Sequence, residues 1–439
     1  MAEPNRTPLA AGYREEPYWW RDAPWLPPSP LAGERRGARS ALPTEMDAVI
    51  VGGGYTGMMA AARLAWRGRS VALLEKNELG SGASSRNGGM VHPGFKADLA
   101  TTLKRDPEGG RQRYQATLDA FALVEETIRV NQIECDYVRT GHLELADKAS
   151  HFQHLEEEAH LLNRQFGVVA RVIPRVELAS EAGTSLYHGA LLFEQSGGLH
   201  PAKYFAGLTR LARDRGAHFF DHTPATGVEA RRRGGFKVST PRGVIQTRDV
   251  LVATNGYSDR LVPWLRRRVI PIGSYIIATA PLPADLAHSV IPNRRMLFDS
   301  KNFLHYWRLS ADNRMLFGGR ASFAPTTIAK AREWLYAGML QIHPQLAGVQ
   351  IEHAWGGNVG FTVDRVPHIG RTKGITYALG YCGTGVAMST YFGQLAADWI
   401  AAGDLPACWQ RSFPAVPFYR EKPWFLPAVG WYYSALDRV

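Results

Sequence analysis

The hydrophobic pattern of residues 47–75 predicts a strand, a helix and a second strand in close succession. Residues 48–51 form a short apolar run rich in β-branched side chains, which is typical of a buried strand. Residues 55–66 are rich in Ala, Met, Leu and Arg and favour a helix, and Gly68 stands where that helix should end. A second apolar run at 70–74 predicts another strand.

Three glycines between the first strand and the helix have the spacing G-x-G-x-x-G. Gly52 permits the tight turn, Gly54 lets the backbone approach a pyrophosphate, and Gly57 lets helix and strand pack closely. The helix N-terminus adds free N–H groups and a positive dipole end. Glu75 follows about 20 residues later, where an acid binds a ribose hydroxyl. An ordinary turn would explain the glycines alone, but the whole arrangement predicts a dinucleotide site.

The loop after Glu75, LGSGASSRNGGMVHPG, is rich in small residues that allow close backbone contact with a bulky ligand. Ser84 and Ser85 can offer hydroxyls to phosphate and Arg86 a charge, while Asn87, Gly88 and Gly89 can lie along a flat ring. The alternative is a flexible surface loop. We favour the ligand interpretation because the loop directly follows the strand that ends at Glu75.

The pattern between residues 269 and 320 is mostly that of β-structure. In the strand FLHYWRL, side chains alternate between two faces, so Tyr306 and Arg308 share one face and His305 and Trp307 the other. Earlier, residues 112–131 and 150–166 predict helices on either side of a strand at 137–146, and the histidines of the second helix are expected to be a solvated face rather than a metal site.

The two ends of the chain are rich in Pro and aromatic residues. Residues 1–45 predict neither helix nor sheet, but an extended arm held on the body by Tyr18, Trp19, Trp20 and Trp25. The expected organisation is an α/β fold, with an N-terminal arm at 1–45, a discontinuous nucleotide-binding domain at 46–95, 196–262 and 346–403, an antiparallel substrate domain at 96–195 and 263–345, and a C-terminal tail at 404–439.

Composition narrows the class of protein. Apolar residues make up 45% of the chain and support a sizeable core. The net charge of +11 favours anionic ligands, but no nucleic-acid-binding module is present. The three cysteines form neither a disulfide framework nor a zinc pattern. Without a signal-peptide pattern or an apolar run of spanning length, we expect a soluble cytoplasmic protein.

Taken in order, several stretches resemble the D-amino acid oxidase family of FAD-dependent oxidoreductases, closest to its γ-glutamylputrescine oxidoreductase-like branch. The resemblance spans nearly the whole chain. Any one of these stretches is weak evidence, but their order is specific. They are IVGGGYTGMMAA with Glu75, GASSRNGGMVHPG, GLHPAKYFAGL, ATNGY, VIPIGSYIIATAPL, YWRLS, RMLFGGR and GYCGTGVAMS.

The resemblance implies FAD held extended between a Rossmann-type domain and an antiparallel substrate domain. It places a helix N-terminus near Val386 at the edge of the flavin that gains negative charge. The implied cofactor-binding residues are Gly52, Gly54, Tyr55, Thr56, Gly57, Glu75, Lys76, Ala83, Ser84, Arg86, Asn87, Gly88, Gly89, Met90, Ala225, Thr254, Asn255, Gly256, Gly383, Thr384, Gly385 and Val386.

Three departures from relatives refine this expectation. Cys382 and Thr384 stand where many relatives have Ser and His. Ala387 stands where sarcosine-oxidase-like members have a substrate-binding lysine, which argues against a sarcosine-like substrate. Those members also tether FAD through a cysteine, but the corresponding stretch here, GGNVGFTVD, has none. Non-covalent FAD is therefore expected, and no metal.

The leading functional hypothesis is oxidation of a C–N bond in a small amine or amino acid. Hydride passes to the flavin, the imine hydrolyses, and O2 or another acceptor removes the electrons. Arg308 with Tyr306 is expected to grip a substrate carboxylate. The alternatives are a structural Arg308 and an aromatic pocket of Tyr275, Tyr306 and Tyr381 for a simple amine. The alternative functions are those of a flavin monooxygenase, an NAD(P)H-dependent flavin reductase and a non-redox flavin-binding protein.

Overall fold

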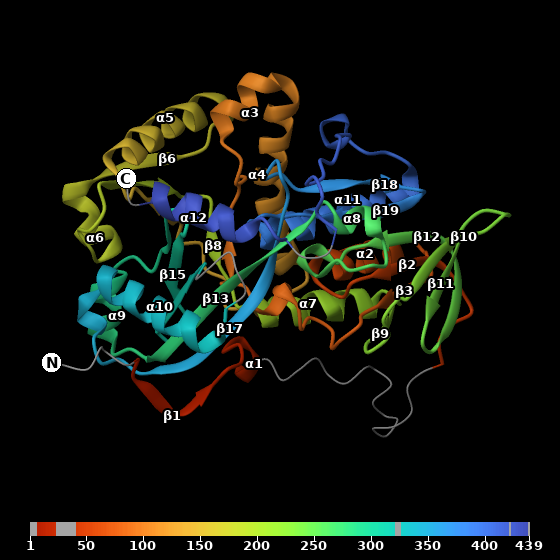
Figure 1. Cartoon of the computed structure of the whole chain (residues 1–439), viewed down its shortest axis with the longest axis horizontal. Helices are drawn as coiled ribbons and strands as arrows, with labels where there is room; N and C mark the ends of the chain where they lie inside the picture. Colours follow the sequence, from red (N-terminus) through yellow and green to blue (C-terminus); the bar gives the residue numbers. More distant parts are fainter. Residues whose placement is uncertain (1–6, 23–40, 321–325, 421–422, 438–439) are drawn as a thin grey trace.

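A computed structural model of the chain describes residues 7–22, 41–320, 326–420 and 423–437. Two large sheets organise these residues (Figure 1). Within the described ranges, the larger sheet has nine strands, mostly antiparallel. In spatial order they are β1 (Leu9–Arg14), β17 (Ile351–Phe361), β13 (Ile270–Pro281), β16 (Arg314–Gly319), β15 (His305–Leu309), β14 (Met296–Asp299), β5 (His142–Leu145), β7 (Gly189–Phe193) and β6 (Ala170–Pro174).

The second sheet has eight strands in the described part of the chain. Its centre is parallel, since β2 pairs in parallel with both β3 and β12. Such strands are covered on both faces, which explains their continuous apolar runs. The strands are β10 (Gly227–Ala230), β11 (Phe236–Thr240), β12 (Gly243–Val252), β2 (Glu45–Val51), β3 (Val71–Leu74) and β9 (His218–Phe220), with β19 (Ile375–Leu379) beside β12 and β18 (His368–Thr372) beside β19.

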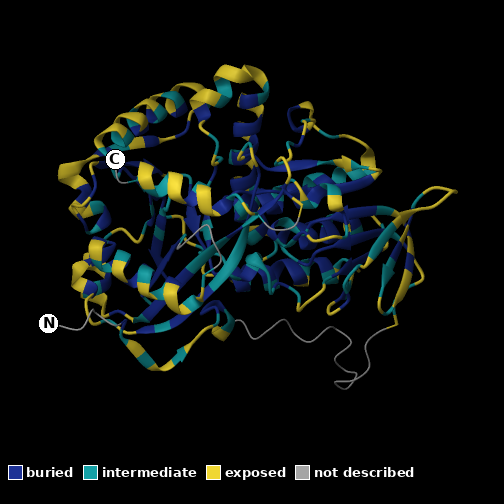
Figure 2. Ribbon diagram, viewed as in Figure 1, coloured by how far each residue is buried: buried dark blue, intermediate teal, exposed yellow. Residues whose placement is uncertain are grey.

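Helices cover both sheets, and their amphipathic faces form the core. In α5, the buried residues Leu155, Ala159 and Leu162 recur at helical spacing, and Figure 2 shows exposed positions along its outer side. A two-stranded ribbon is formed by β4 (Met90–Val91) and β8 (Gly197–Gly198). The helices are α1 (Trp19–Asp22), α2 (Tyr55–Trp66), α3 (Leu99–Arg105), α4 (Pro107–Val130), α5 (Ala149–Phe166), α6 (Leu178–Ala182), α7 (Pro201–Asp214), α8 (Pro263–Arg266), α9 (Ala284–Val290), α10 (Ile328–Ile342), α11 (Gly385–Ala402) and α12 (Leu426–Leu436).

The β–α–β unit predicted from the sequence is confirmed as β2, α2 and β3. The Gly57 position shows why the third glycine is needed, because a Cβ there would collide with the carbonyl oxygen of Gly52. The core face predicted for β15 is also confirmed. Trp307 is fully buried in the core of the nine-stranded sheet. The three histidines of α5 belong to no group of metal-ligating side chains among the described residues.

The N-terminal arm differs from its prediction. Residues 1–45 were expected to contain neither helix nor sheet, but β1 joins the nine-stranded sheet beside β17, and α1 follows it. Tyr18 and Trp19 are nearly fully buried, as expected of anchoring aromatics, whereas Trp25 lies outside the described residues. The segment 351–361, assigned from sequence to the nucleotide-binding domain, is strand β17 of the other sheet.

Candidate active site

A cavity of about 580 Å³ is lined by residues of both sheets and of the loops between them. Its lining includes Glu75, the N-termini of α2 and α11, Tyr306 of β15 and the loop before α3. The predicted cofactor residues that line it are Gly52, Gly54, Tyr55, Thr56, Glu75, Lys76, Ala83, Ser84, Arg86, Asn87, Gly88, Met90, Ala225, Thr254, Asn255, Gly383, Thr384, Gly385 and Val386.

Three predicted cofactor residues, Gly57, Gly89 and Gly256, do not line the cavity but lie behind its wall. Each is a point where two backbone segments meet closely. A Cβ at Gly89 would collide with the Leu199 carbonyl oxygen, and one at Gly256 would lie 3.0 Å from the Gly360 nitrogen. These glycines therefore shape the wall by permitting close packing.

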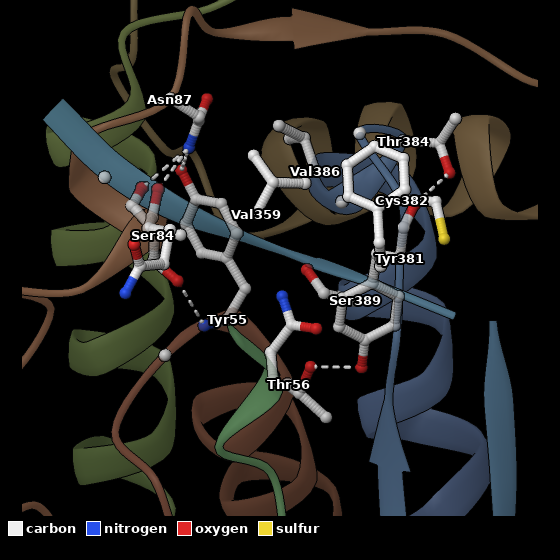
Figure 3. A pocket seen from close by; sticks show the side chains of 18 of the residues that line it. Tyr55, Thr56, Ser84, Asn87, Val359, Tyr381, Cys382, Thr384, Val386 and Ser389 are labelled. Carbon is white, nitrogen blue, oxygen red and sulfur yellow. Dashed lines mark hydrogen bonds between the residues drawn. The ribbon is translucent and has the colours of Figure 1, made fainter. Parts of the chain in front are cut away.

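The turn before α2 forms a narrow glycine cradle. Gly52 has a φ of +113°, which favours glycine, and a Cβ at Gly54 would lie 2.8 Å from the Ser84 hydroxyl oxygen. That hydroxyl accepts a hydrogen bond of 3.0 Å from the Tyr55 backbone N–H, as Figure 3 shows. Ser84 therefore joins the loop at residues 79–94, called the cofactor loop below, to the first turn of α2. There, backbone N–H groups and the helix dipole favour an anion.

Glu75 lies at the far end of this cradle, with Ala225 on the same stretch of wall. Its Oε2 accepts a hydrogen bond of 2.8 Å from the Gly53 N–H, and its Oε1 one of 3.0 Å from the Asn77 N–H. These two bonds hold the carboxylate at the mouth of the glycine turn. A carboxylate has further lone pairs, so it can still accept hydrogen bonds from a ribose.

The N-terminus of α11 reaches the cavity from the opposite side (Figure 3). Gly383 has a φ of +113° and turns the chain into the helix. The Tyr381 hydroxyl lies 2.7 Å from the Thr56 hydroxyl of α2, so this contact joins α2 to the turn that precedes α11. Tyr381 is 3% exposed, and this bond occupies the group that was considered for binding substrate.

Tyr306 is directed into the cavity, and Ser274 of β13 holds its hydroxyl at 3.0 Å. Burial raises the Tyr306 pKa to about 12, so the phenol remains a neutral donor and acceptor. Tyr275, the next residue of β13, faces elsewhere and its hydroxyl donates to the Thr326 carbonyl at 3.2 Å. Of the considered aromatic trio, Tyr306 and Tyr381 therefore line the cavity, whereas Tyr275 does not.

Arg308 does not line the cavity. Its Nε donates to the Gly88 carbonyl at 2.8 Å and its Nη2 to the Leu199 carbonyl at 2.6 Å. The guanidinium also lies 5.5 Å from the ring of Trp19. These contacts correct the expectation of a carboxylate grip: Arg308 holds the cofactor loop from behind, and it is 6% exposed.

The arginine that does line the cavity is Arg320, at the end of the RMLFGGR stretch. It lies near Tyr306, its Nη1 donates to the Asn302 carbonyl at 3.2 Å, and its guanidinium is 4.6 Å from the Phe361 ring. Burial lowers its pKa to about 10, which still leaves it charged at neutral pH. Sequence reasoning quoted this stretch but did not single out its arginine.

The N-terminal arm supports the cofactor loop from outside the cavity. The indole N–H of Trp19 donates to the Asn87 carbonyl at 2.9 Å, and that of Trp20 to the Ser85 hydroxyl at 2.8 Å. The guanidinium of Arg86 stacks 4.6 Å from the Trp20 ring. The arm therefore contacts three consecutive residues of the loop, although about 65 residues separate them along the chain.

The groove fits an extended dinucleotide. Its lining combines an acid, the glycine cradle and the N-termini of two helices, the second of them beside a buried tyrosine. The fold and groove together define a dinucleotide-binding protein built on two large sheets. The family model described as "DAO: FAD dependent oxidoreductase" matches residues 47–399. The chain belongs to this family of FAD-dependent oxidoreductases.

Similar proteins agree with this assignment. The probable oxidoreductase OrdL of Haemophilus influenzae is 33% identical over 82% of this chain and 83% of its own length. The gamma-glutamylputrescine oxidoreductase of Escherichia coli K12 is 31% identical over 90% of this chain and 93% of its own. The crystal structure of glycine oxidase from Geobacillus kaustophilus shares the fold, with a TM-score of 0.70 at 22% identity over 87% of this chain and 99% of that one.

No helix within the described residues has both the length and the hydropathy needed to cross a membrane.

Proposed function

We propose that the protein oxidises a C–N bond of a small amine or amino acid, with FAD bound non-covalently in the groove. The observation that carries this proposal is the continuity of one cavity from the glycine cradle to Tyr306 and Arg320. Bound FAD supplies the ring that accepts a hydride. The chain's own residues orient the amine beside that ring and exclude water. Hydride transfer from a neutral amine needs no general base at a fixed position.

Residues near the ring site suit a polar substrate. The Tyr306 hydroxyl, held by Ser274, can bond an amine or carboxylate, and the Arg320 guanidinium can pair with a carboxylate. Names of similar proteins point to related substrates, namely gamma-glutamylputrescine and glycine. A substrate that bears both an amino group and a carboxylate, or a simple amine, therefore fits this part of the cavity.

Cys382 supports non-covalent binding. Its thiol lines the cavity but donates to the Gly380 carbonyl at 3.2 Å, and burial raises its pKa to about 11. A thiol held in its protonated form is a poor nucleophile. It is therefore not prepared to attack the flavin.

Anaerobic titration of the holoenzyme with candidate amines tests the function. Loss of the oxidised flavin colour on addition of an amine supports C–N oxidation. Bleaching by NAD(P)H but by no amine would identify a flavin reductase or monooxygenase instead. Absence of bleaching with every donor would favour a non-redox flavin-binding protein.

A further inference from the structure

Arg365 lines the cavity together with Arg320, and both arginines are connected to the C-terminal helix α12. Burial, and in the same direction the Arg365 charge, lowers the Arg320 pKa, so the two guanidiniums are close enough to interact. Two neighbouring cations on one cavity wall favour an anion beside them. What holds these two side chains in place therefore decides how well such an anion is bound.

Helix α12 presents one face to this part of the protein. The residues of that face recur at helical spacing and are buried or half-buried, namely Leu426, Val429, Gly430, Tyr433 and Asp437. The helix itself contains no charged residue from 426 to 436. Polar contacts from its inner face therefore come from the Tyr433 hydroxyl and from Asp437, which directly follows the helix.

The apolar part of this inner face packs against the outer side of the cavity wall. Leu426, Val429 and Tyr433 belong to one hydrophobic cluster with four residues that line the cavity. These four are Ile272, Val359, Phe361 and Cys382. In the described part of the chain, no residue of α12 lines the cavity itself. The helix is therefore an outer layer, and it acts on the cavity only through the residues that it contacts.

Tyr433 holds Arg365. Its hydroxyl accepts a hydrogen bond of 2.7 Å from Arg365 Nη2. Within the described residues, the Arg365 side chain makes no other hydrogen bond and no ion pair. Arg365 also has a φ of +57°, a conformation that costs a non-glycine residue free energy and that gathers at ligand sites. The tyrosine therefore fixes the direction of an arginine that has no other partner there.

Asp437 holds the turn between β14 and β15. Its Oδ1 accepts hydrogen bonds from the Asn302 backbone N–H at 3.0 Å and from Asn302 Nδ2 at 2.9 Å. Its Oδ2 accepts one from the Phe303 N–H at 2.9 Å. The Asn302 carbonyl in turn accepts the bond of 3.2 Å from Arg320 Nη1. Asp437 is therefore connected to Arg320 through a single intervening residue.

These contacts differ from those of a helix that only covers a core. Apolar packing alone would hold α12 in place, because the hydrophobic effect has no direction. Hydrogen bonds do have a direction, and they weaken steeply when their geometry is disturbed. Both polar side chains of the inner face use such bonds on a cavity arginine or on the residue that holds one.

We propose that Tyr433 and Asp437 are positioning residues, which hold Arg365 and Arg320 so that the two guanidiniums bind one carboxylate of the substrate together. The planar guanidinium fork suits a carboxylate, provided that its orientation is fixed. The inference rests on the proposed function, because it concerns substrate binding in the same cavity. Neither positioning residue touches the reacting atoms, and each acts through an arginine.

The test measures the binding of benzoate to the holoenzyme, with benzamide as an uncharged ligand of similar shape. Each Kd comes from the change in the flavin spectrum on titration, so no turnover is needed. Tyr433→Phe removes one hydrogen bond and should raise the benzoate Kd about 2- to 10-fold. Asp437→Ala should raise it at least as much, whereas Asp437→Asn keeps one acceptor oxygen for Asn302 and should raise it less. The benzamide Kd should change less than about 2-fold in every variant.

Tyr432→Phe is the matched control, because Tyr432 is the preceding residue of the same helix and is 62% exposed. It should leave both Kd values unchanged. A double-mutant cycle then shows whether each residue acts through its arginine. Tyr433→Phe should have no further effect on benzoate binding when combined with Arg365→Met, and Asp437→Ala none when combined with Arg320→Met.

Three results would overturn the proposal. The first is a lower melting temperature of the Tyr433 and Asp437 variants with an unchanged benzoate Kd, since this would make α12 a purely structural element. The second is an equal change in the Kd of benzoate and benzamide. The third is a wild-type protein that binds benzoate no more tightly than benzamide.

The outcome also separates this proposal from that of C–N oxidation. Benzoate binding that depends on Tyr433 and Asp437, in a holoenzyme that no amine bleaches, supports the positioning role and contradicts C–N oxidation. Bleaching by amines, with benzoate binding that none of the variants alters, supports C–N oxidation and contradicts the positioning role.

Discussion

The indole of Trp20 donates a hydrogen bond of 2.8 Å to the Ser85 hydroxyl, and that hydroxyl in turn donates to the Gly80 carbonyl at 2.7 Å. Ser85 is fully buried, so the bond joins the N-terminal arm to the inside of the cofactor loop. The neighbouring residues Ser84 and Arg86 face the cavity. The arm therefore supports this loop from outside the cavity, since neither Trp19 nor Trp20 is among the residues that line it.

Replacing this tryptophan should weaken FAD binding. Trp20→Phe keeps an aromatic ring beside Arg86 but loses the N–H donor, and a single hydrogen bond contributes about 0.5–1.5 kcal/mol. FAD affinity, measured by fluorescence titration of the apoprotein, should fall about 2- to 10-fold. Trp424→Phe, at a position 65% exposed, is the control and should have no effect. Unchanged affinity in Trp20→Phe would show that the loop holds its shape without the arm.

Glu75 should contribute one charge-assisted hydrogen bond to the bound cofactor. Glu75→Ala removes it and should cost roughly 1.5–3 kcal/mol of FAD affinity. Because Glu75 also accepts bonds from Gly53 and Asn77, the melting temperature of the apoprotein should be compared as well. A loss of melting temperature with intact FAD affinity would assign Glu75 a purely structural role.

Arg308 and Arg320 should respond oppositely to substitution. Arg308→Lys leaves two backbone carbonyls without a matched partner, so it should lower the melting temperature and leave KM within about 2-fold. Arg320→Met should raise KM for a carboxylate-bearing amine about 10-fold or more, with little change for a simple amine. A large KM effect from Arg308→Lys at unchanged melting temperature would reverse these roles.

The flavin should leave the protein on denaturation. Acid precipitation should release the yellow colour into the supernatant, because Cys382 is buried and protonated and no other cysteine lines the cavity within the described residues. Colour that stays in the pellet would contradict non-covalent binding. Cys382→Ser and His92→Ala would then identify the attachment point.

Glu158 should make stability fall as pH rises. Its pKa is raised in the folded protein, through burial and the carboxylates of Glu144 and Asp98, so the folded state holds a proton that the unfolded chain releases earlier. The contribution is present below about pH 4.5 and is lost as pH passes about 8. Glu158→Gln cannot ionise, so its melting temperature should exceed that of the wild type at pH 9 and equal it near pH 4.5. Equal melting temperatures at both pH values would contradict the shift.

The glycine cradle could be predicted from the local sequence, but the part of the cavity around Tyr306 and Arg320 could not. The Gly52–Gly54–Gly57 spacing and Glu75 act within one β–α–β unit, so their geometry follows from neighbours in the chain. The alternation in β15 correctly placed Tyr306 and Arg308 on one face. It could not show which position along that face reaches the cavity, since this depends on how the sheet meets the cofactor loop.

The cavity wall formed by β5 and α5 shows the same limit more sharply. Glu144 belongs to strand β5, and Glu158 belongs to helix α5, which follows it in the sequence. Both line one cavity only because β5 and α5 enclose it together. In the sequence, Glu158 is one of three consecutive glutamates. Nothing in that run distinguishes the residue that faces inward from Glu157, which faces solvent.

The pairing of β1 with β17 has a consequence for synthesis of the protein. Leu9 lies beside Ile351 in parallel register, so the arm leaves the ribosome long before its partner strand exists. At about 5–20 residues per second, the interval is on the order of tens of seconds. During it, β1 has no partner strand and Trp19 lacks Ile276, Leu316 and Trp355 of its hydrophobic cluster, so the arm supports the cofactor loop only in part. A nascent chain therefore completes its flavin site only when translation is nearly finished, which makes cofactor loading a late event in the maturation of this enzyme.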